Sequence, residues 1–172
     1  MIVVFSTSLN PDSRSRILAR AASAALDGLG ELNKLIDLAE LSLPFCDARD
    51  CYSDPGVLRC AASIRDASAV LIATPIYNYD ASASAKNLVE LTGAAWEGKI
   101  VGFMAAAGGA GSYMSTMGLV NSMMLDFGTF IIPRFVYATE DAFEENQLRD
   151  DNIRNRIHGL VEETLRVARA LG

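Results

Sequence analysis

An uncharged apolar run at residues 69–73 ends at a proline that is followed by aromatic and amide side chains. The run is too short for a typical helix and is typical of a buried strand in a parallel sheet. Pro75 has no N–H to donate and fixes its own φ, so we expect it to end the strand. Ligands of open α/β sheets bind beyond the carboxyl ends of strands. Residues 74–79 therefore indicate a site for a flat, partly polar ligand, with an ordinary strand-to-helix loop as the alternative.

Strand and helix patterns alternate along the 172 residues, which predicts one domain, residues 1–172, with helices on both faces of a parallel sheet. We expect strands at residues 2–5, 35–38, 69–73, 100–104 and from 129, and helices at about 13–26, from 55, and at about 82–92, 112–126 and 150–171. A doubly wound five-stranded sheet of order 2-1-3-4-5 fits this count. The helix at 112–126 is apolar on nearly all sides, which predicts burial in the core or at a subunit contact.

Charge and hydropathy exclude several classes of partner. The net charge of −6 argues against nucleic acid or an anionic membrane surface as the main partner. The first strand begins at Ile2, which leaves no room for a signal peptide, and no apolar stretch reaches the length of a membrane span. We therefore expect a cytoplasmic protein.

The three cysteines are Cys46, Cys51 and Cys60. An odd number does not form a disulfide framework, and their spacing does not suit a metal site. We expect ordinary thiols that are buried or half-buried.

The loop after the first strand, residues 6–16, is rich in hydroxyl groups. Ser8, Ser13, Arg14 and Ser15 stand where a helix begins, and free N–H groups at that point favour a phosphate. Ser13 as a simple N-cap is the alternative. The Walker lysine pattern is missing, which argues against a nucleoside triphosphate.

Two further loops follow the third and fourth strands. Tyr77 and Tyr79 offer aromatic faces to a ring, and Gly108 and Gly109 let backbone approach a flat ligand closely. The glycine loop is not a dinucleotide fingerprint, because Met114 occupies the third glycine position. A plain tight turn is the alternative.

The chain offers no acid–base or nucleophilic set of its own. Its only histidine, His158, lies in the last predicted helix. This indicates that a cofactor carries the chemistry.

With these loops in place, the chain resembles the NADPH-dependent FMN reductase family of flavodoxin-like proteins over nearly its whole length. The family opens with Gly-Ser and then Ser/Arg/Ser before the first helix, and Thr7-Ser8 and Ser13-Arg14-Ser15 take these places. Its second loop reads Thr-Pro-x-Tyr-Asn, then Lys-Asn, as do residues 74–78 and 86–87 here. Its glycine-rich loop corresponds to residues 108–111.

The resemblance implies an enzyme with bound FMN that takes hydride from NADPH or NADH and reduces free flavin, a quinone, an azo compound or a metal oxyanion. It implies that the FMN phosphate is held by Ser8, Ser13, Arg14 and Ser15. The isoalloxazine would be lined by Pro75, Ile76, Tyr77 and Asn78, with Gly108 and Gly109 at its other edge. It also implies a homodimer or homotetramer, with residues 86–96 and 117–127 as candidate contacts.

Three departures affect the expected ring environment. Thr7 replaces the leading glycine, Ser82-Ala83 replaces a Pro-Gly or Ser-Gly, and Tyr79-Asp80 replaces smaller residues. Three other interpretations stay open: a flavodoxin-like electron carrier without NADPH activity, an iron–sulfur flavoprotein, and a flavin-free interaction domain on the same fold.

Overall fold

The computed structural model describes residues 1–171 and shows the predicted doubly wound sheet; Gly172 lies outside the described residues. The strands are β1 (Ile2–Ser6), β2 (Asn33–Asp37), β3 (Ala69–Tyr77), β4 (Asp80–Ala81), β5 (Ile100–Ala106), β6 (Phe130–Ile131), β7 (Val136–Ala138), β8 (Phe143–Glu144) and β9 (Gln147–Leu148). The order is β2-β1-β3-β5, with β6 and β7 both parallel to β5. Taken as one interrupted strand, β6 and β7 complete the predicted order 2-1-3-4-5.

The fifth strand is split because Pro133 cannot donate to the ladder between its two halves. β6 pairs with the start of β5, where Ile100 is opposite Phe130. β7 pairs with its end, where Ala106 is opposite Ala138. The antiparallel pair β8–β9 forms a separate small sheet.

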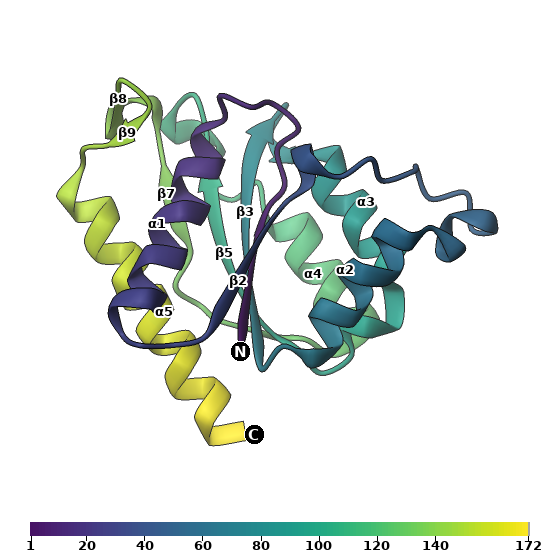
Figure 1. The fold of residues 1–172 in the computed structure, drawn as a ribbon. Coiled ribbons are helices and arrows are strands. Elements are labelled where there is room, and N and C mark those ends of the chain that lie inside the picture. The colour runs from purple at the N-terminus through teal and green to yellow at the C-terminus, as the bar shows by residue number, and fades with distance from the viewer. Residues whose placement is uncertain (172) are drawn as a thin grey trace.

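Helices cover both faces of the sheet (Figure 1). They are α1 (Arg14–Gly28), α2 (Pro55–Asp66), α3 (Ala83–Thr92), α4 (Met117–Phe127) and α5 (Asp151–Leu171), with short 3-10 turns η1 (Leu38–Glu40), η2 (Asp50–Ser53), η3 (Gly93–Trp96), η4 (Ala110–Ser112) and η5 (Glu140–Ala142). α1 and α5 pack on one face, and α2, α3 and α4 pack on the other. Because β3 is covered on both sides, its first seven residues are all buried, which explains the uncharged run.

The expectation that Pro75 ends the third strand is wrong. β3 continues to Tyr77 and folds back through a two-residue turn to pair with β4. β1 ends at Ser6, opposite Ala73, and the pairing with β4 begins only at Ile76, so Pro75 itself is paired with β5 alone and its other edge tolerates proline. The turn residues Asn78 and Tyr79 have φ of 51° and 63°, as a tight hairpin turn requires.

The fourth helix begins at Met117, five residues later than predicted, because η4 and a loop occupy the residues before it. Leu119, Val120 and Met123 face the core, but Leu125 remains 79% exposed. The helix is therefore only partly buried within one chain.

None of the helices within residues 1–171 is both long enough and apolar enough to cross a membrane.

Candidate functional site

The loops after β1, β3 and β5 meet at the carboxyl edge of the sheet, as predicted. The Ser84 hydroxyl, in α3, donates to the carbonyl of Thr7 in the first loop. On the other side, the Tyr79 hydroxyl lies 3.4 Å from the point where a Cβ on Gly111 would stand. The hairpin of β3 and β4 thus lies between the hydroxyl-rich loop and the glycine-rich loop.

A buried network of hydroxyl groups joins the first two loops. The Thr7 hydroxyl donates to the Ala73 carbonyl at 3.2 Å and lies 3.3 Å from the Ser82 hydroxyl, which is also 3.3 Å from that of Thr74. Ser82 also caps α3 by accepting from the Ala85 N–H. Thr7 and Ser82, which depart from the family pattern, therefore form part of one structural network. Sequence reasoning missed this role, although an N-cap residue before a helix pattern was a usable signal.

The loop that the sequence predicts to bind a phosphate, residues 6–16 (the phosphate loop), presents three buried serines near the start of α1. Ser13 is the N-cap, and its hydroxyl accepts from the Ser15 N–H at 3.3 Å and lies 2.8 Å from the Ser15 hydroxyl. The Ser8 hydroxyl accepts from the Asn10 N–H at 3.2 Å, which leaves its own proton available for a ligand. The first turn of this 15-residue helix contains no acidic residue, so its positive end is not neutralised locally. Ser13 is an N-cap, and the arrangement also suits an anion.

Two arginines of this segment have different surroundings. Arg14 is half-exposed, and its guanidinium lies 2.7 Å from the carboxylate of Glu140, which is itself exposed. Arg16, which sequence reasoning did not single out, is buried in an ion pair with Asp37 and donates to the Pro11 carbonyl at 2.6 Å. Arg16 therefore fastens the phosphate loop to the end of β2, whereas Arg14 is held near the edge of the loop.

The predicted ring-binding residues lie along the hairpin. Pro75 is buried, Ile76 is partly buried, and Tyr77 and Asn78 are exposed. Tyr77 and Tyr79 are 52% and 73% exposed, so neither is packed away in the core. The hairpin thus presents aromatic surface to the space above the sheet edge.

The glycine loop has open space where side chains would be. A Cβ on Gly108 or Gly109 would meet no protein atom within 4 Å, and neither glycine has a positive φ. The loop is held by Tyr137 of β7, whose hydroxyl donates to the Gly109 carbonyl at 2.5 Å and lies 2.6 Å from the Ser112 hydroxyl. The fold does not demand glycine here, so the space suits a ligand that approaches the backbone.

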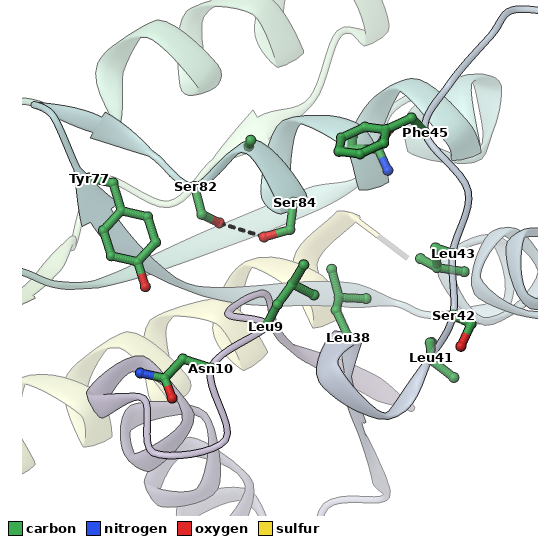
Figure 2. Close-up of a pocket in the computed structure, with 12 residues that line it drawn as sticks. Leu9, Asn10, Leu38, Leu41, Ser42, Leu43, Phe45, Tyr77, Ser82 and Ser84 are labelled. Carbon is green, nitrogen blue, oxygen red and sulfur yellow. Dashed lines mark hydrogen bonds between the residues drawn. The ribbon is translucent and has the colours of Figure 1, made fainter.

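A cavity of about 330 Å³ opens beside the hairpin, between Tyr77 and the segment that follows β2. Figure 2 shows Tyr77 and Phe45 on opposite sides of this space, with Ser82 and Ser84 between them. Its lining residues are Leu9, Asn10, Leu38, Leu41, Ser42, Leu43, Phe45, Tyr77, Ser82, Ala83, Ser84 and Asn87. The lining is mostly apolar and includes no charged residue.

Among the predicted site residues, only Tyr77 lines this cavity; the serines and glycines lie around the adjoining sheet edge. Sequence reasoning missed the wall formed by Leu38, Leu41, Leu43 and Phe45. The available signal was the spacing of large apolar residues through a segment predicted in part as loop.

Comparisons with known proteins agree with this geometry. Residues 1–144 match the family described as NADPH-dependent FMN reductase. An NAD(P)H-dependent FAD/FMN reductase of Geobacillus thermodenitrificans is 30% identical over 135 residues, which cover 77% of this chain and 73% of that protein.

Two solved structures share the fold. A flavoenzyme NAD(P)H:(acceptor) oxidoreductase of Paracoccus denitrificans matches with a TM-score of 0.76 and 22% identity, over 98% of this chain and 97% of that one. An oxidoreductase of Corynebacterium diphtheriae matches with a TM-score of 0.78 and 18% identity, over 97% of this chain and 95% of that one. At these identities the likeness shows a common fold.

Proposed function

The chain belongs to the NADPH-dependent FMN reductase family and is an NAD(P)H-dependent flavin oxidoreductase, and we propose that it holds FMN among the three loops at the carboxyl edge of its sheet. The observation that supports this placement most strongly is the juxtaposition of buried serines, exposed hairpin aromatics and open glycine backbone. These features match the phosphate, the ring face and the ring edge of one ligand. The residues present therefore fit the cofactor that the family uses.

The phosphate is proposed to bind Ser8, Ser13 and Ser15 at the start of α1. Hydroxyl protons and free N–H groups of the first turn would donate to its oxygens, and the helix dipole would add to the attraction. Arg14 is the proposed cationic partner, and it must exchange its contact with Glu140 for the phosphate. Arg16 keeps the loop in place through Asp37 without touching the ligand.

The ring is proposed to lie along Pro75, Ile76, Tyr77 and Asn78. Gly108 and Gly109 would approach its other edge, because open space lies above both residues. When bound there, FMN supplies two-electron chemistry that accepts hydride from NADPH or NADH and delivers electrons to an acceptor.

The chain's own residues bind and orient the reactants. Tyr77 lines the cavity and also belongs to the segment proposed to hold the ring, so it is proposed to set the side from which an acceptor arrives. His158 is exposed on α5, and no role in proton transfer is assigned to it. The proposed role of the protein is placement of the two partners, with the redox step supplied by the cofactor.

The cavity beside Tyr77 is the proposed acceptor site. Its walls are apolar, with Phe45 opposite Tyr77, and its lining includes no cation. Such a lining favours an uncharged, flat acceptor such as a quinone or an azo compound over a metal oxyanion, which would need positive charge.

We further propose a cytoplasmic homodimer or homotetramer. The exposed side chains of Met124 and Leu125 on α4 are the proposed contact. Trp96, at the end of the other candidate segment, is fully buried within the chain and donates to the Thr92 hydroxyl at 2.7 Å, so it is not available for a partner.

The test is an anaerobic titration of the purified protein after incubation with FMN. We expect NADPH or NADH to bleach the visible flavin band, and the double variant Arg14→Ala/Ser15→Ala to bind FMN more weakly. A flavin band that neither nucleotide alters would instead support the electron carrier. Unchanged FMN affinity in the double variant would place the phosphate elsewhere.

A further inference from the structure

Two of the three cysteines face each other in the segment that walls the cavity. The sulfurs of Cys46 and Cys51 are 4.0 Å apart, with the Cys51 thiol directed at Cys46. The Tyr52 hydroxyl oxygen lies 3.6 Å from the Cys46 sulfur. Cys46 is partly exposed, whereas Cys51 is buried. A pair with one accessible and one sheltered thiol is the arrangement in which the first sulfur is oxidised and the second attacks it.

The backbone between the two cysteines is already ordered as a loop that holds them together. The Asp47 carboxylate accepts from the N–H groups of Arg49 at 2.9 Å and Cys51 at 3.2 Å. Ala48 is in the left-handed region, with φ of 59°, which turns the chain back on itself. Sulfurs in a disulfide are about 2.0 Å apart, so closure needs an approach of about 2 Å, which rotation of the side chains can supply.

Cys60 serves as an internal contrast. It is buried in the main core on the α2 side of the sheet, packed with Phe5 and Ile64 as neighbours in one apolar cluster. Burial raises the pKa of this thiol, which lowers its reactivity. Burial also raises the pKa of the Cys51 thiol, and Cys46 is the more exposed member of the pair.

We propose that Cys46 and Cys51 form a peroxide-oxidisable dithiol that closes reversibly to a disulfide directly after Phe45, which lines the cavity. This inference concerns the thiols alone and does not depend on where FMN binds. The three cysteines are free thiols that are buried or half-buried, as expected, and the proposal adds a reaction for two of them.

The oxidant is hydrogen peroxide, and the reaction balances in two steps. The Cys46 thiolate attacks one peroxide oxygen, the O–O bond breaks, and the leaving hydroxide takes up the thiol proton to form water. The Cys51 sulfur then attacks the sulfenic acid on Cys46, the S–O bond breaks, and the hydroxyl leaves as water with the Cys51 proton. Two thiols lose two electrons to one peroxide, and one disulfide and two waters result.

The position of the pair links its redox state to the cavity. The Cys46 N–H donates to the Asn87 side chain at 2.9 Å, and that side chain donates to the Pro44 carbonyl at 2.9 Å. Phe45, between these two contacts, lines the cavity together with Asn87. Cys46 is thus next to a residue of the cavity wall, and if the cavity receives the acceptor as proposed, we expect the disulfide to change the KM for the acceptor.

The experiment treats the full chain with one equivalent of hydrogen peroxide and then counts free thiols and maps disulfides by peptide mass spectrometry. We expect loss of two thiols, a single Cys46–Cys51 cross-link, and full recovery with dithiothreitol. Cys60→Ala is the matched control and should form the same cross-link. Cys51→Ser should instead retain a sulfenic acid on Cys46 that dimedone labels.

Retention of all three thiols, or a cross-link that includes Cys60, would overturn the proposal. Dimedone labelling of Cys46 in the unmutated chain, without a cross-link, would also overturn it, because Cys51 would then not be the attacking partner. Thiol counts and peptide masses do not require FMN, so they remain informative even if the proposed flavin site is wrong.

Discussion

At the scale of single residues, small side chains do most of the shaping of this site. Hydroxyl groups of Thr7, Thr74 and Ser82 form a buried network between two loops. Such a network is stable only when its members are satisfied, because an unpaired buried hydroxyl costs about 1–3 kcal/mol. Gly108 and Gly109, in contrast, leave open space that no other part of the protein fills.

The variant Gly109→Ala tests whether glycine at this position is needed for ligand binding or for folding. The added methyl group meets open space and no strained backbone, so thermal stability should not fall. If a ring edge approaches this backbone, the methyl group should weaken FMN binding about tenfold, or about 1.4 kcal/mol. Flavin fluorescence titration and thermal unfolding together measure both effects.

Gly28→Ala is the control, since Gly28 also has open space around its Cβ position but lies at the far end of α1. It should leave FMN affinity unchanged. Unaltered affinity in Gly109→Ala would show that the ring does not approach this loop.

At the scale of elements, the β3–β4 hairpin is the part that most distinguishes this site. The hairpin projects aromatic residues past the end of β1, and its turn places Tyr79 at a φ of 63°. A bulky residue in the left-handed region costs about 1–2 kcal/mol. The turn therefore holds strain at the point where ligand contact is proposed.

Tyr79→Gly should stabilise the protein by about 1 kcal/mol in urea unfolding, because glycine removes the strain and the lost ring is mostly exposed. Asn78→Gly is the matched variant and should gain less, since asparagine tolerates this conformation better. A net loss of stability in Tyr79→Gly would mean that contact with the glycine loop outweighs the strain.

At the scale of the whole molecule, the alternation of strand and helix patterns in the sequence predicted a sheet between two layers of helices. It did not predict several of the tertiary contacts. The order of the strands and the meeting of three loops were predictable, because parallel strands bring their carboxyl ends to one edge. The hairpin was not, since Asn78-Tyr79 lacks the usual glycine of such a turn. Whether Pro75 interrupts a ladder depends on where β1 ends, which is a tertiary property.

The spacing of large apolar residues after β2 was a usable signal for burial, but local sequence does not show that these residues form a cavity wall. Leu41 and Phe45 become a wall only when the segment after β2 folds over the start of α3, through the contacts of Asn87. The burial of Trp96 depends in the same way on a residue distant in sequence, Phe5, whose ring centroid lies 6.4 Å away. Such pairings need the fold before they can be recognised.

Leu125→Glu tests the proposed assembly. Leu125 is 79% exposed on α4, so a charge there should leave the fold intact but should dissociate a homo-oligomer that buries this face. Sedimentation velocity should show a fall in mass. Leu32→Glu, at a position that is 72% exposed between α1 and β2, should keep the assembly of the unmutated chain. If the unmutated chain, Leu125→Glu and Leu32→Glu all have the same mass in solution, the contact between subunits does not include Leu125.

The segment after β2 extends outward from the body of the domain (Figure 1) and is anchored to α3 at few points. Substitutions at its exposed positions, such as Phe45, should leave the sheet and the serine loop in place, whereas Leu38, Leu41 and Leu43 also pack against the core. If the cavity receives the acceptor as proposed, substitutions confined to the exposed part of this arm would change which compound is reduced and leave the rest of the fold as it is.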